Sequence, residues 1–281
     1  MIDLHCHTKI SDNNLSMLEV ITLAKHNGVE HLSITDHDTT IGLLEAMKIG
    51  EQVGVNIIPG IEISAYDYKN GRRAHILGFH VTPGHPAISE LCQPMIVKRH
   101  EASEQMTNMI INEGYNITWE RVLEISHGGT GVYKQHIMHA LIEQNYTESI
   151  YGDLYKTLFS RGERGAAKGI AHIPLEYVDV YDAIEAILEA GGVPVIAHAA
   201  QFNNWDAIPS MVAGGLQGIE VRHPDHNDQV EAKAREIAET YKLAFTGGSD
   251  FHGMYGERGA CELGSKNPGV ASLESLQAKR G

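Results

Sequence analysis

The sequence predicts an α/β fold with about seven core strands, and three observations support this prediction. Strand-like and helix-like segments alternate along most of the chain. Histidines and acidic residues gather at the ends of the strand-like segments, where the active sites of parallel α/β barrels lie. A stretch of helices without strands interrupts this series at residues 86–170. Repeated strand–helix units imply parallel strands with right-handed crossovers, in either a barrel or an open doubly wound sheet.

The predicted strands are apolar runs that are bounded by glycine or polar residues. They cover residues 2–7, 31–38, 55–64, 193–199, 216–223 and 243–250. Residues 65–81 are expected to form a β-hairpin, and the Asn70-Gly71 pair within it predicts a type I′ turn.

The predicted helices carry apolar residues at helical spacing. Outside the interruption they cover residues 16–28, 39–54, 179–192, 205–215, 228–242 and 272–279. Inside it they cover residues 88–114, 118–126, 134–144 and 151–160. Ser16 is the expected N-cap of the first helix, and Gly28 and Gly54 are expected to end the first and second helices.

The length of 281 residues allows a barrel domain, which we assign to residues 1–85 and 171–281, with residues 86–170 as a helical insertion that caps the site. Acidic residues outnumber basic ones by 36 to 22, and the resulting net charge of −14 argues against broad nucleic-acid binding. Three cysteines without CxxC spacing predict no disulfide framework and a reducing cytoplasm. We expect no membrane span, because no apolar run is long enough, and no secretion signal.

The first predicted strand carries Asp3, His5 and His7 at alternate positions. In a regular strand these polar side chains share one face, and the apolar residues between them, including Cys6, take the other. His5 and His7 then lie roughly 7 Å apart at Cα, so both imidazoles can contact one ion. A pair of exposed histidines without a metal is equally compatible with this pattern alone.

Nearly every predicted strand ends in an imidazole or a carboxylate. Beyond the first strand these residues are Asp12, Asp36, His37, Glu62, His75, His198, Asp250 and His252. Both groups are ligands for divalent metals such as Zn²⁺, Mn²⁺ and Fe²⁺. Because so many ligands at one end of a sheet exceed the needs of one ion, we predict two or three divalent metal ions.

The segments around these residues resemble the PHP (polymerase and histidinol phosphatase) family of metal-dependent phosphoesterases. The motifs "DLHCHT" with Asp12 after it, "ITDHDT", "GIEIS", "AHILG", "IAHAA" and "GSDFHG" occur in the family order and cover almost the whole chain. This resemblance implies a distorted seven-stranded (β/α) barrel that holds a trinuclear metal site.

The resemblance also implies a role for each ligand. The three expected groups are His5, His7, Glu62 and Asp250 for one metal, His75 and His198 with a bridging Glu62 for a second, and Asp12, His37 and His252 for a third. Asp3 and Asp36 are expected to orient neighbouring imidazoles. For Asp36 a helix-capping or loop role is an equal alternative.

In the insertion, the resemblance implies an Arg-x-His pair that contacts a substrate phosphate. Lys134 and His136 stand there in this chain. Lysine keeps the charge of arginine but loses its bidentate fork, so we expect a phosphate contact and leave the substrate open. A solvated lysine beside a packed histidine is the alternative.

Two further groups of basic residues are candidate substrate contacts. Arg161, Arg164 and Lys168 form a local basic excess in an acidic chain, which favours either an anion-binding rim or an ordinary solvated loop. Arg222 and His223 end another strand, and since strand parity points them to opposite faces, at most one should face the site.

We expect this chain to hydrolyse a phosphoester of a small ribose phosphate or nucleotide by means of a metal-bound hydroxide. The expected catalytic residues are Glu62, Asp250, His37 and His223, with His223 or a metal-bound water protonating the leaving oxygen. A cyclic diester, a monoester or both could be cleaved, and two cationic groupings favour a substrate with two phosphate positions. No membrane and no large nucleic-acid partner is expected.

Two other classes of protein stay open at this point. An exonuclease on short RNA or DNA would use the same metals, but it should show an extended basic or aromatic track, which the sequence lacks. A non-enzymatic metal-binding or regulatory module would close its coordination spheres with protein ligands.

Overall fold

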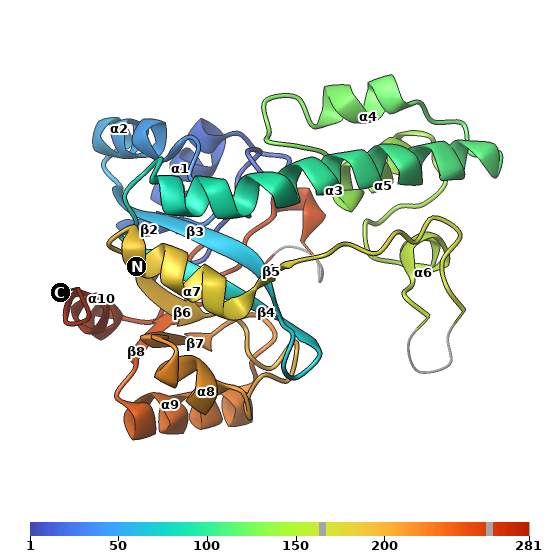
Figure 1. Ribbon diagram of the computed structural model, residues 1–281. Coiled ribbons are helices and arrows are strands. Elements are labelled where there is room, and N and C mark those ends of the chain that lie inside the picture. Colours follow the sequence, from blue (N-terminus) through green and yellow to red (C-terminus); the bar gives the residue numbers. More distant parts are fainter. Residues whose placement is uncertain (163–166, 257–260, 281) are drawn as a thin grey trace.

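The computed structural model describes residues 1–162, 167–256 and 261–280. Its centre is a nearly closed, barrel-shaped sheet with helices on the outside (Figure 1). The strands are β1 (Ile2–Asp3), β2 (His31–Ile34), β3 (Asn56–Asp67), β4 (Arg72–Phe79), β5 (Val178–Asp179), β6 (Val193–Ile196), β7 (Gly218–Arg222) and β8 (Ala244–Gly247). Their order is β1-β2-β3-β4-β6-β7-β8, and the two-residue β5, which the sequence did not predict, pairs with β3.

The sheet closes where the segment after β8 meets the segment after β1. The Leu4 N–H donates to the Gly247 carbonyl at 3.1 Å, and the Asp250 N–H donates to the His5 carbonyl at 2.8 Å. The prediction of a distorted barrel is therefore confirmed, and the open doubly wound sheet is not formed. Closure also places His5 and Asp250, which are 245 residues apart in sequence, side by side.

β1 is shorter than predicted, because regular pairing ends at Asp3 and Cys6 rejoins the sheet only through an isolated bridge to Phe251. Leu4 packs inside the barrel with Phe79, whereas Cys6 packs in the outer core between sheet and helices. The expected single apolar face is therefore wrong for this segment, since strict alternation needs a regular strand.

The predicted hairpin is confirmed as β3 and β4, and β4 is also antiparallel to β6. Its turn is not type I′. Four residues, 68–71, connect the strands, and among them only Gly71 has a positive φ, of 66°. The Asp67 carboxylate accepts a hydrogen bond from the Asn70 N–H, so an aspartate-capped loop takes the place of the two-residue turn.

Helices pack against the outside of the barrel. They are α1 (Met17–His26), α2 (Leu43–Val53), α7 (Val180–Glu189), α8 (Ile208–Ala213), α9 (Asp228–Tyr241) and α10 (Val270–Gln277). The predicted caps are confirmed: Ser16 forms a capping box with Glu19, and Gly54 ends α2 in the left-handed conformation. Leu276 of α10 packs inside the barrel with Leu77.

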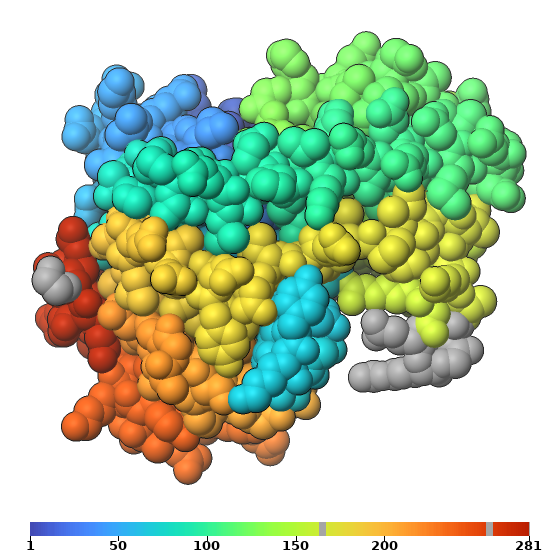
Figure 2. All heavy atoms as spheres, in the orientation of Figure 1, coloured from blue at the N-terminus to red at the C-terminus, as the bar shows by residue number. Residues whose placement is uncertain are grey.

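The insertion forms a lobe beside the barrel (Figure 2). Its helices are α3 (Pro86–Asn112), α4 (Trp119–Ile125), α5 (Lys134–Glu143) and α6 (Asp153–Phe159). α3 belongs to both parts, because Ile88 packs in the barrel core and Met106 packs in the core of the insertion. Tyr255, from the short helix η2 (Gly253–Tyr255) of the barrel, also packs in the insertion. The domain boundaries remain a prediction.

None of the helices in the described part of the chain has the length and apolar character needed to cross a membrane.

Candidate metal centre

Histidines and carboxylates converge at one end of the barrel. Three overlapping groups have ligand atoms within 4.8 Å of one another: His5, His7, Glu62 and Asp250; His7, Asp12, His37 and His252; and His37, Glu62 and His75. The remaining predicted ligand, His198, has its Nε2 atom 2.9 Å from Glu62 Oε1. The structure therefore brings all of the predicted ligands into one cluster.

Within the first group the ligand atoms surround a common point. The Nε2 atoms of His5 and His7 each lie 3.2 Å from Glu62 Oε2 and 3.2 Å from Asp250 Oδ1. Ligands that are each about 2.0–2.2 Å from a metal lie roughly 3–3.5 Å from one another. The spacing thus fits a metal ion.

Glu62 links the group of His5, His7 and Asp250 to the pair of His75 and His198. While its Oε2 atom faces His5 and His7, its Oε1 atom lies 2.8 Å from His75 Nδ1 and 2.9 Å from His198 Nε2. The group that contains Asp12 and His252 is looser, with His252 Nε2 3.9 Å from Asp12 Oδ2. The central place of Glu62 agrees with the bridging role that the resemblance implies.

A buried carboxylate that the sequence analysis missed fixes the orientation of His5. Glu220 Oε1 accepts from His5 Nδ1–H at 2.9 Å, and Glu220 Oε2 accepts from the His198 N–H at 2.8 Å. With its proton on Nδ1, His5 presents a free Nε2 lone pair to the cluster, as a metal ligand requires.

The expected role of Asp3 is wrong. Its carboxylate accepts hydrogen bonds from the backbone N–H groups of His5, Ser249 and Gly264, and it contacts no imidazole in the described chain. Asp3 therefore fastens the segment after β8 to β1, because a buried carboxylate can satisfy several orphaned amides.

Asp36 reaches the cluster indirectly. It accepts from both the N–H and the hydroxyl of Thr8 and from the Ser11 hydroxyl, which lies 3.5 Å from His7 Nδ1. The carboxylate thus supports the loop that carries His7, and it acts on that imidazole through Ser11 rather than by direct contact.

Two candidate ligands have unusual backbone conformations. Asp250 has a φ of 49° and His198 a φ of 24°, and non-glycine residues with positive φ cluster at functional sites. Gly248 is needed nearby, because a Cβ atom there would collide with the backbone nitrogen of His5. The "GGSD" segment therefore brings Asp250 up to His5 at close range.

The electrostatics favour ionised carboxylates. Burial alone would raise the pKa of Glu62, but the imidazoles of His37 and His5 outweigh it and hold this pKa well below its usual range. Burial likewise opposes the ionisation of Asp250, and His5, with the hydrogen bond from His223, again lowers its pKa well below normal. Anionic oxygens are the form that binds cations.

Several buried ligand atoms have no hydrogen-bond partner in the described chain. These are His7 Nε2, Asp12 Oδ1 and Asp250 Oδ1. Buried polar atoms are normally paired, so a cluster of orphaned atoms that converge on one space calls for a further partner. Together with the imidazole and carboxylate donor set, this observation shows that the residues fit divalent metal ions.

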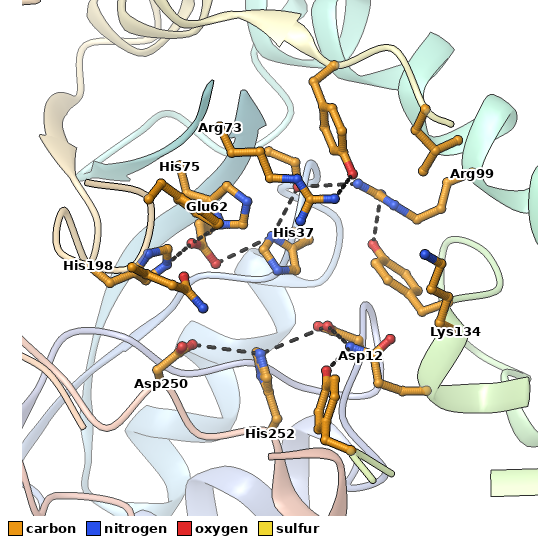
Figure 3. Close-up of a pocket in the computed structure, with 18 of the residues that line it drawn as sticks. Asp12, His37, Glu62, Arg73, His75, Arg99, Lys134, His198, Asp250 and His252 are labelled. Carbon is orange, nitrogen blue, oxygen red and sulfur yellow. Dashed lines mark hydrogen bonds and ion pairs between the residues drawn. The ribbon is translucent and has the colours of Figure 1, made fainter. Parts of the chain in front are cut away.

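The cluster opens into a cavity of about 440 Å³. The described residues on its wall include Asp12, Glu62 and His75 on the side of the metal ligands and Arg73, Arg99 and Lys134 among the basic residues. Figure 3 shows Arg99 and Lys134 across the cavity from His198 and Asp250. The cavity therefore has an acidic, histidine-rich side from the barrel and a cationic side to which the insertion contributes.

The predicted substrate contacts in the insertion differ in position. Lys134 lines the cavity, with its Nζ atom 5.1 Å from the centre of the Phe159 ring. His136 does not line it, because the side chain is buried and its Nδ1 atom accepts from the Tyr133 N–H. His136 therefore shapes the start of α5, and the expectation that it contacts substrate is not supported by its position.

The remaining predicted residues lie around the edge. His223 donates from Nε2 to Asp250 at 3.1 Å, whereas Arg222 binds the Asn267 carbonyl away from the cavity, so one of the two faces the site. Arg161 pairs through its backbone with Lys168 and is not on the cavity wall. Arg164 lies outside the described residues.

Several residues of the site were not predicted from the sequence, among them Arg73, Arg99, Gln135, Glu220 and Tyr177. Arg73 stands two positions before His75, so strand parity could have placed it on the same face. Gln135 donates to Asp12 at 2.9 Å, and Arg99 reaches the cavity from α3. No local pattern marks these two, because they depend on how the insertion docks.

The whole chain resembles proteins of known families. The PHP domain family matches residues 3–193. The chain belongs to the PHP domain family. A phosphoribosyl 1,2-cyclic phosphate 1,2-diphosphodiesterase from Eggerthella lenta is 42% identical over 254 residues, which are 90% of this chain and 95% of that protein. A 5'-3' exoribonuclease from Haemophilus influenzae is 29% identical, with 89% of each chain covered.

Solved structures agree with these similarities. The structure of a proposed metal-dependent phosphoesterase from Bifidobacterium adolescentis matches with a TM-score of 0.88 and 27% identity, and it covers 100% of this chain and 96% of that one. The predicted family and the predicted enzyme class, a phosphoric ester hydrolase of the PHP family, are therefore confirmed. The family and the ligand clusters indicate divalent metals.

Proposed function

We propose that this PHP-family phosphoesterase hydrolyses a small ribose phosphate, and that its preferred substrate is a cyclic phosphodiester of ribose that bears a second phosphate. One observation supports this most strongly. The cluster of metal ligands around Glu62 opens into a cavity of about 440 Å³, and the opposite wall of this cavity carries cationic side chains. The high similarity to the Eggerthella lenta enzyme over almost the whole of both chains adds support.

In this proposal the nine predicted ligands hold two or three divalent ions, with Mn, Fe and Zn as the candidates. When bound, such ions polarise phosphoryl oxygens and lower the pKa of water towards neutrality. Glu62 carries the central role, because its two oxygens face different pairs of histidines. Asp250 and His37 complete the ligand groups on either side of it.

The other residues of the site would act on the substrate directly. Lys134 offsets negative charge that develops on the phosphoryl oxygens, as a cationic side chain in a shielded site does best. His223 holds Asp250 and is our candidate for protonating the leaving oxygen, since it borders a smaller adjoining cavity of about 50 Å³ together with Asp250. Arg161, Arg222 and His136 are not part of this mechanism, and the predicted role of Arg164 stays a prediction.

A second candidate function is exonucleolytic cleavage of short RNA. The sequence analysis found no aromatic track, yet Tyr133, Tyr151, Tyr155 and Tyr177 line the cavity, and aromatic rings can stack on nucleotide bases. The Haemophilus influenzae relative favours the same alternative. We rank it second because its similarity to this chain is lower and because the chain is strongly acidic.

We also propose a reducing cytoplasmic location, which the three unpaired cysteines support.

The experiment compares hydrolysis of phosphoribosyl 1,2-cyclic phosphate, a short 5'-phosphorylated RNA and an aryl phosphate, each with added Mn²⁺, Fe²⁺ or Zn²⁺. Chromatography detects the ring-opened monoester and any phosphate from the first substrate, mononucleotides from the RNA and the free phenol from the aryl phosphate. We expect the cyclic ribose phosphate to have the highest kcat/KM and Glu62→Gln to abolish its hydrolysis. Higher kcat/KM for RNA would favour the second candidate, and no hydrolysis of any ester with any of these metals would contradict both.

A further inference from the structure

The basic residues on the cavity wall differ in how their charges are compensated. Arg99 donates to the Asp38 carboxylate at 2.6 Å, so a neighbouring anion already balances it. Arg73 forms no ion pair with a carboxylate of the described residues, although its Nε atom is buried and lacks a hydrogen-bond partner. A half-buried guanidinium without an anion is unfavourable, and a ligand anion would relieve this cost.

Arg73 is held in place before any ligand arrives. Its guanidinium donates to the Tyr177 hydroxyl and lies 4.8 Å from the centre of the Tyr177 ring. Its own carbonyl accepts a hydrogen bond from the Asn204 side chain at 2.8 Å. A fixed planar guanidinium is well suited to bidentate recognition of phosphate, because little side-chain entropy is lost when the anion binds.

The surroundings of Tyr177 are cationic as well. Burial raises the pKa of the Tyr177 hydroxyl, whereas the charges of Arg99 and Arg161 oppose this shift, so both guanidinium groups lie close enough to act on it. The positive charge near Tyr177 thus comes from the hairpin, from α3 and from the segment after α6, although Arg161 itself is not on the cavity wall.

The position of Arg73 relative to the metal ligands follows from strand geometry. Arg73 and His75 are two residues apart on β4, where they pair with Tyr66 and Ser64 of β3. Residues at this spacing point to the same face and lie roughly 7 Å apart along the strand. An anion on Arg73 would therefore be about one pentose ring away from a phosphoester at the metal centre.

We propose that Arg73 and Tyr177 form a binding subsite for a second, non-reacting phosphate of the substrate. This inference rests on the proposed function and deepens it, because it assigns the two phosphate positions of the substrate to different walls. The reacting phosphoester lies at the metal ligands beside Lys134, and the remote phosphate lies against the β3–β4 hairpin. The subsite thus selects doubly phosphorylated sugars over simple phosphoesters.

The test compares two substrates that differ only in the remote phosphate: phosphoribosyl 1,2-cyclic phosphate and ribose 1,2-cyclic phosphate, assayed with the metal-loaded full chain. For Arg73→Gln, the ratio of the two kcat/KM values should fall by about tenfold to hundredfold, the range expected for a charge-assisted hydrogen bond. Most of the loss should appear in KM, because the remote group binds equally well in ground and transition states. Arg73→Lys should lie between wild type and Arg73→Gln.

Arg72→Gln is the matched control. Arg72 is the neighbouring arginine on the same strand, but it points to the opposite face and pairs with the exposed Asp206. Its substitution should leave the ratio of the kcat/KM values for the two substrates close to that of the wild type. Measurable turnover of ribose 1,2-cyclic phosphate by Arg73→Gln shows in the same assay that the variant folds.

Three outcomes would overturn the subsite. Equal losses of kcat/KM on both substrates would make Arg73 a structural residue or a contact of the reacting group, and no loss on either substrate would remove it from recognition altogether. If Arg72→Gln changed the ratio of the two kcat/KM values as much as Arg73→Gln, the effect would come from the loss of any nearby positive charge rather than from a specific subsite. A wild-type enzyme that hydrolyses neither substrate would instead overturn the proposed function on which the subsite rests.

Discussion

At the scale of single residues, Glu62 is the carboxylate that joins separate sets of candidate metal ligands. Each of its carboxylate oxygens faces a different set of imidazoles, whereas Asp12 belongs to one group only. Substitution of even an outer partner of a metal ligand commonly costs about 10–100-fold in activity or metal affinity, so substitution of a ligand itself should cost at least this much. We expect Glu62→Gln to lose more than about a hundredfold in kcat and Asp12→Asn about tenfold to hundredfold.

Both variants keep the size of the side chain, so they differ from the wild type mainly in charge. Steady-state kinetics at saturating metal measures the effect, and circular dichroism checks the fold. Similar, mild losses in the two variants would contradict the central role of Glu62.

Lys134 is a basic residue of the insertion on the wall of the cavity. We expect Lys134→Ala to lower kcat/KM by about tenfold to hundredfold for aryl phosphates and ribose phosphates alike, because it contacts the reacting phosphoryl group. Elemental analysis should find an unchanged metal content, since Lys134 is not a ligand. A loss confined to doubly phosphorylated substrates would move Lys134 to the remote phosphate instead.

The same residue gives the enzyme a pH dependence. Burial lowers the pKa of Lys134 to about 8, so its positive charge is present below this pH and is lost as the pH rises through it. The contribution of Lys134 to kcat/KM should therefore decline above about pH 8 in the wild type. Lys134→Arg, whose guanidinium stays protonated, should show a weaker decline in a parallel pH profile. Identical pH profiles for the wild type and Lys134→Arg would show that Lys134 does not cause the decline in kcat/KM at high pH.

The residues of the site also show what sequence can and cannot predict. The metal ligands were found because imidazoles and carboxylates recur in short motifs with chemical meaning, although Glu62 and His75 lie within β3 and β4 rather than at their ends. Glu220 was missed although it lies on a predicted strand, because nothing in "GIEVRH" tells a buried carboxylate from an exposed one. Gln135 and Arg99 were missed because their positions depend on packing between distant segments.

At the scale of elements, a buried ion pair joins the insertion to the barrel. Arg99 of α3 binds Asp38, which follows β2, and the Asp38 side chain is 1% exposed. Removal of one partner leaves the other as an unpaired buried charge, which typically costs about 3–5 kcal/mol. We expect Arg99→Leu to lower the free energy of unfolding by about this amount in urea denaturation.

Lys98→Ala provides the comparison from the neighbouring position on α3. Lys98 pairs with Glu176, but their side chains are 53% and 84% exposed, and such surface pairs contribute less than about 1 kcal/mol. Comparable losses in the two variants would mean that the Arg99–Asp38 pair does not anchor α3.

The elements themselves were predictable to different degrees. The caps of α1 and α2 and the hairpin follow from local signals, and the repeated strand–helix units predicted the sheet. β1 departs from its pattern because closure against β8 bends the chain after Asp3. The segment of α3 was assigned to the insertion from the sequence, but its buried residues divide between the barrel core and the core of the insertion. Local sequence does not predict this division, because it depends on how the insertion docks.

At the scale of the whole molecule, part of the net charge of −14 is concentrated at the metal cluster. Asp12, Glu62, Glu220 and Asp250 are all part of, or directly bonded to, the cluster at one end of the barrel. Their mutual repulsion is only partly offset by imidazoles, which are neutral in the form that binds metals. Bound cations would therefore stabilise the fold as well as supply the chemistry.

The metal ions should consequently raise the stability of the folded chain, and this can be measured without any substrate. A ligand that binds only the folded state stabilises it by about 2.7 kcal/mol at one hundred times its Kd, so the thermal midpoint should rise with added Mn²⁺ or Zn²⁺ and fall with a chelator. Elemental analysis of the purified protein should find more than one divalent ion per chain. Glu62→Gln should lose most of the thermal shift because it takes part in two ligand groups, while Asp12→Asn should keep the larger share of it. Glu176→Gln, at an exposed site that belongs to none of the ligand groups, should behave as the wild type. One ion or none per chain in a fully active preparation, or a thermal shift that Glu62→Gln leaves intact, would contradict a multinuclear centre built on Glu62.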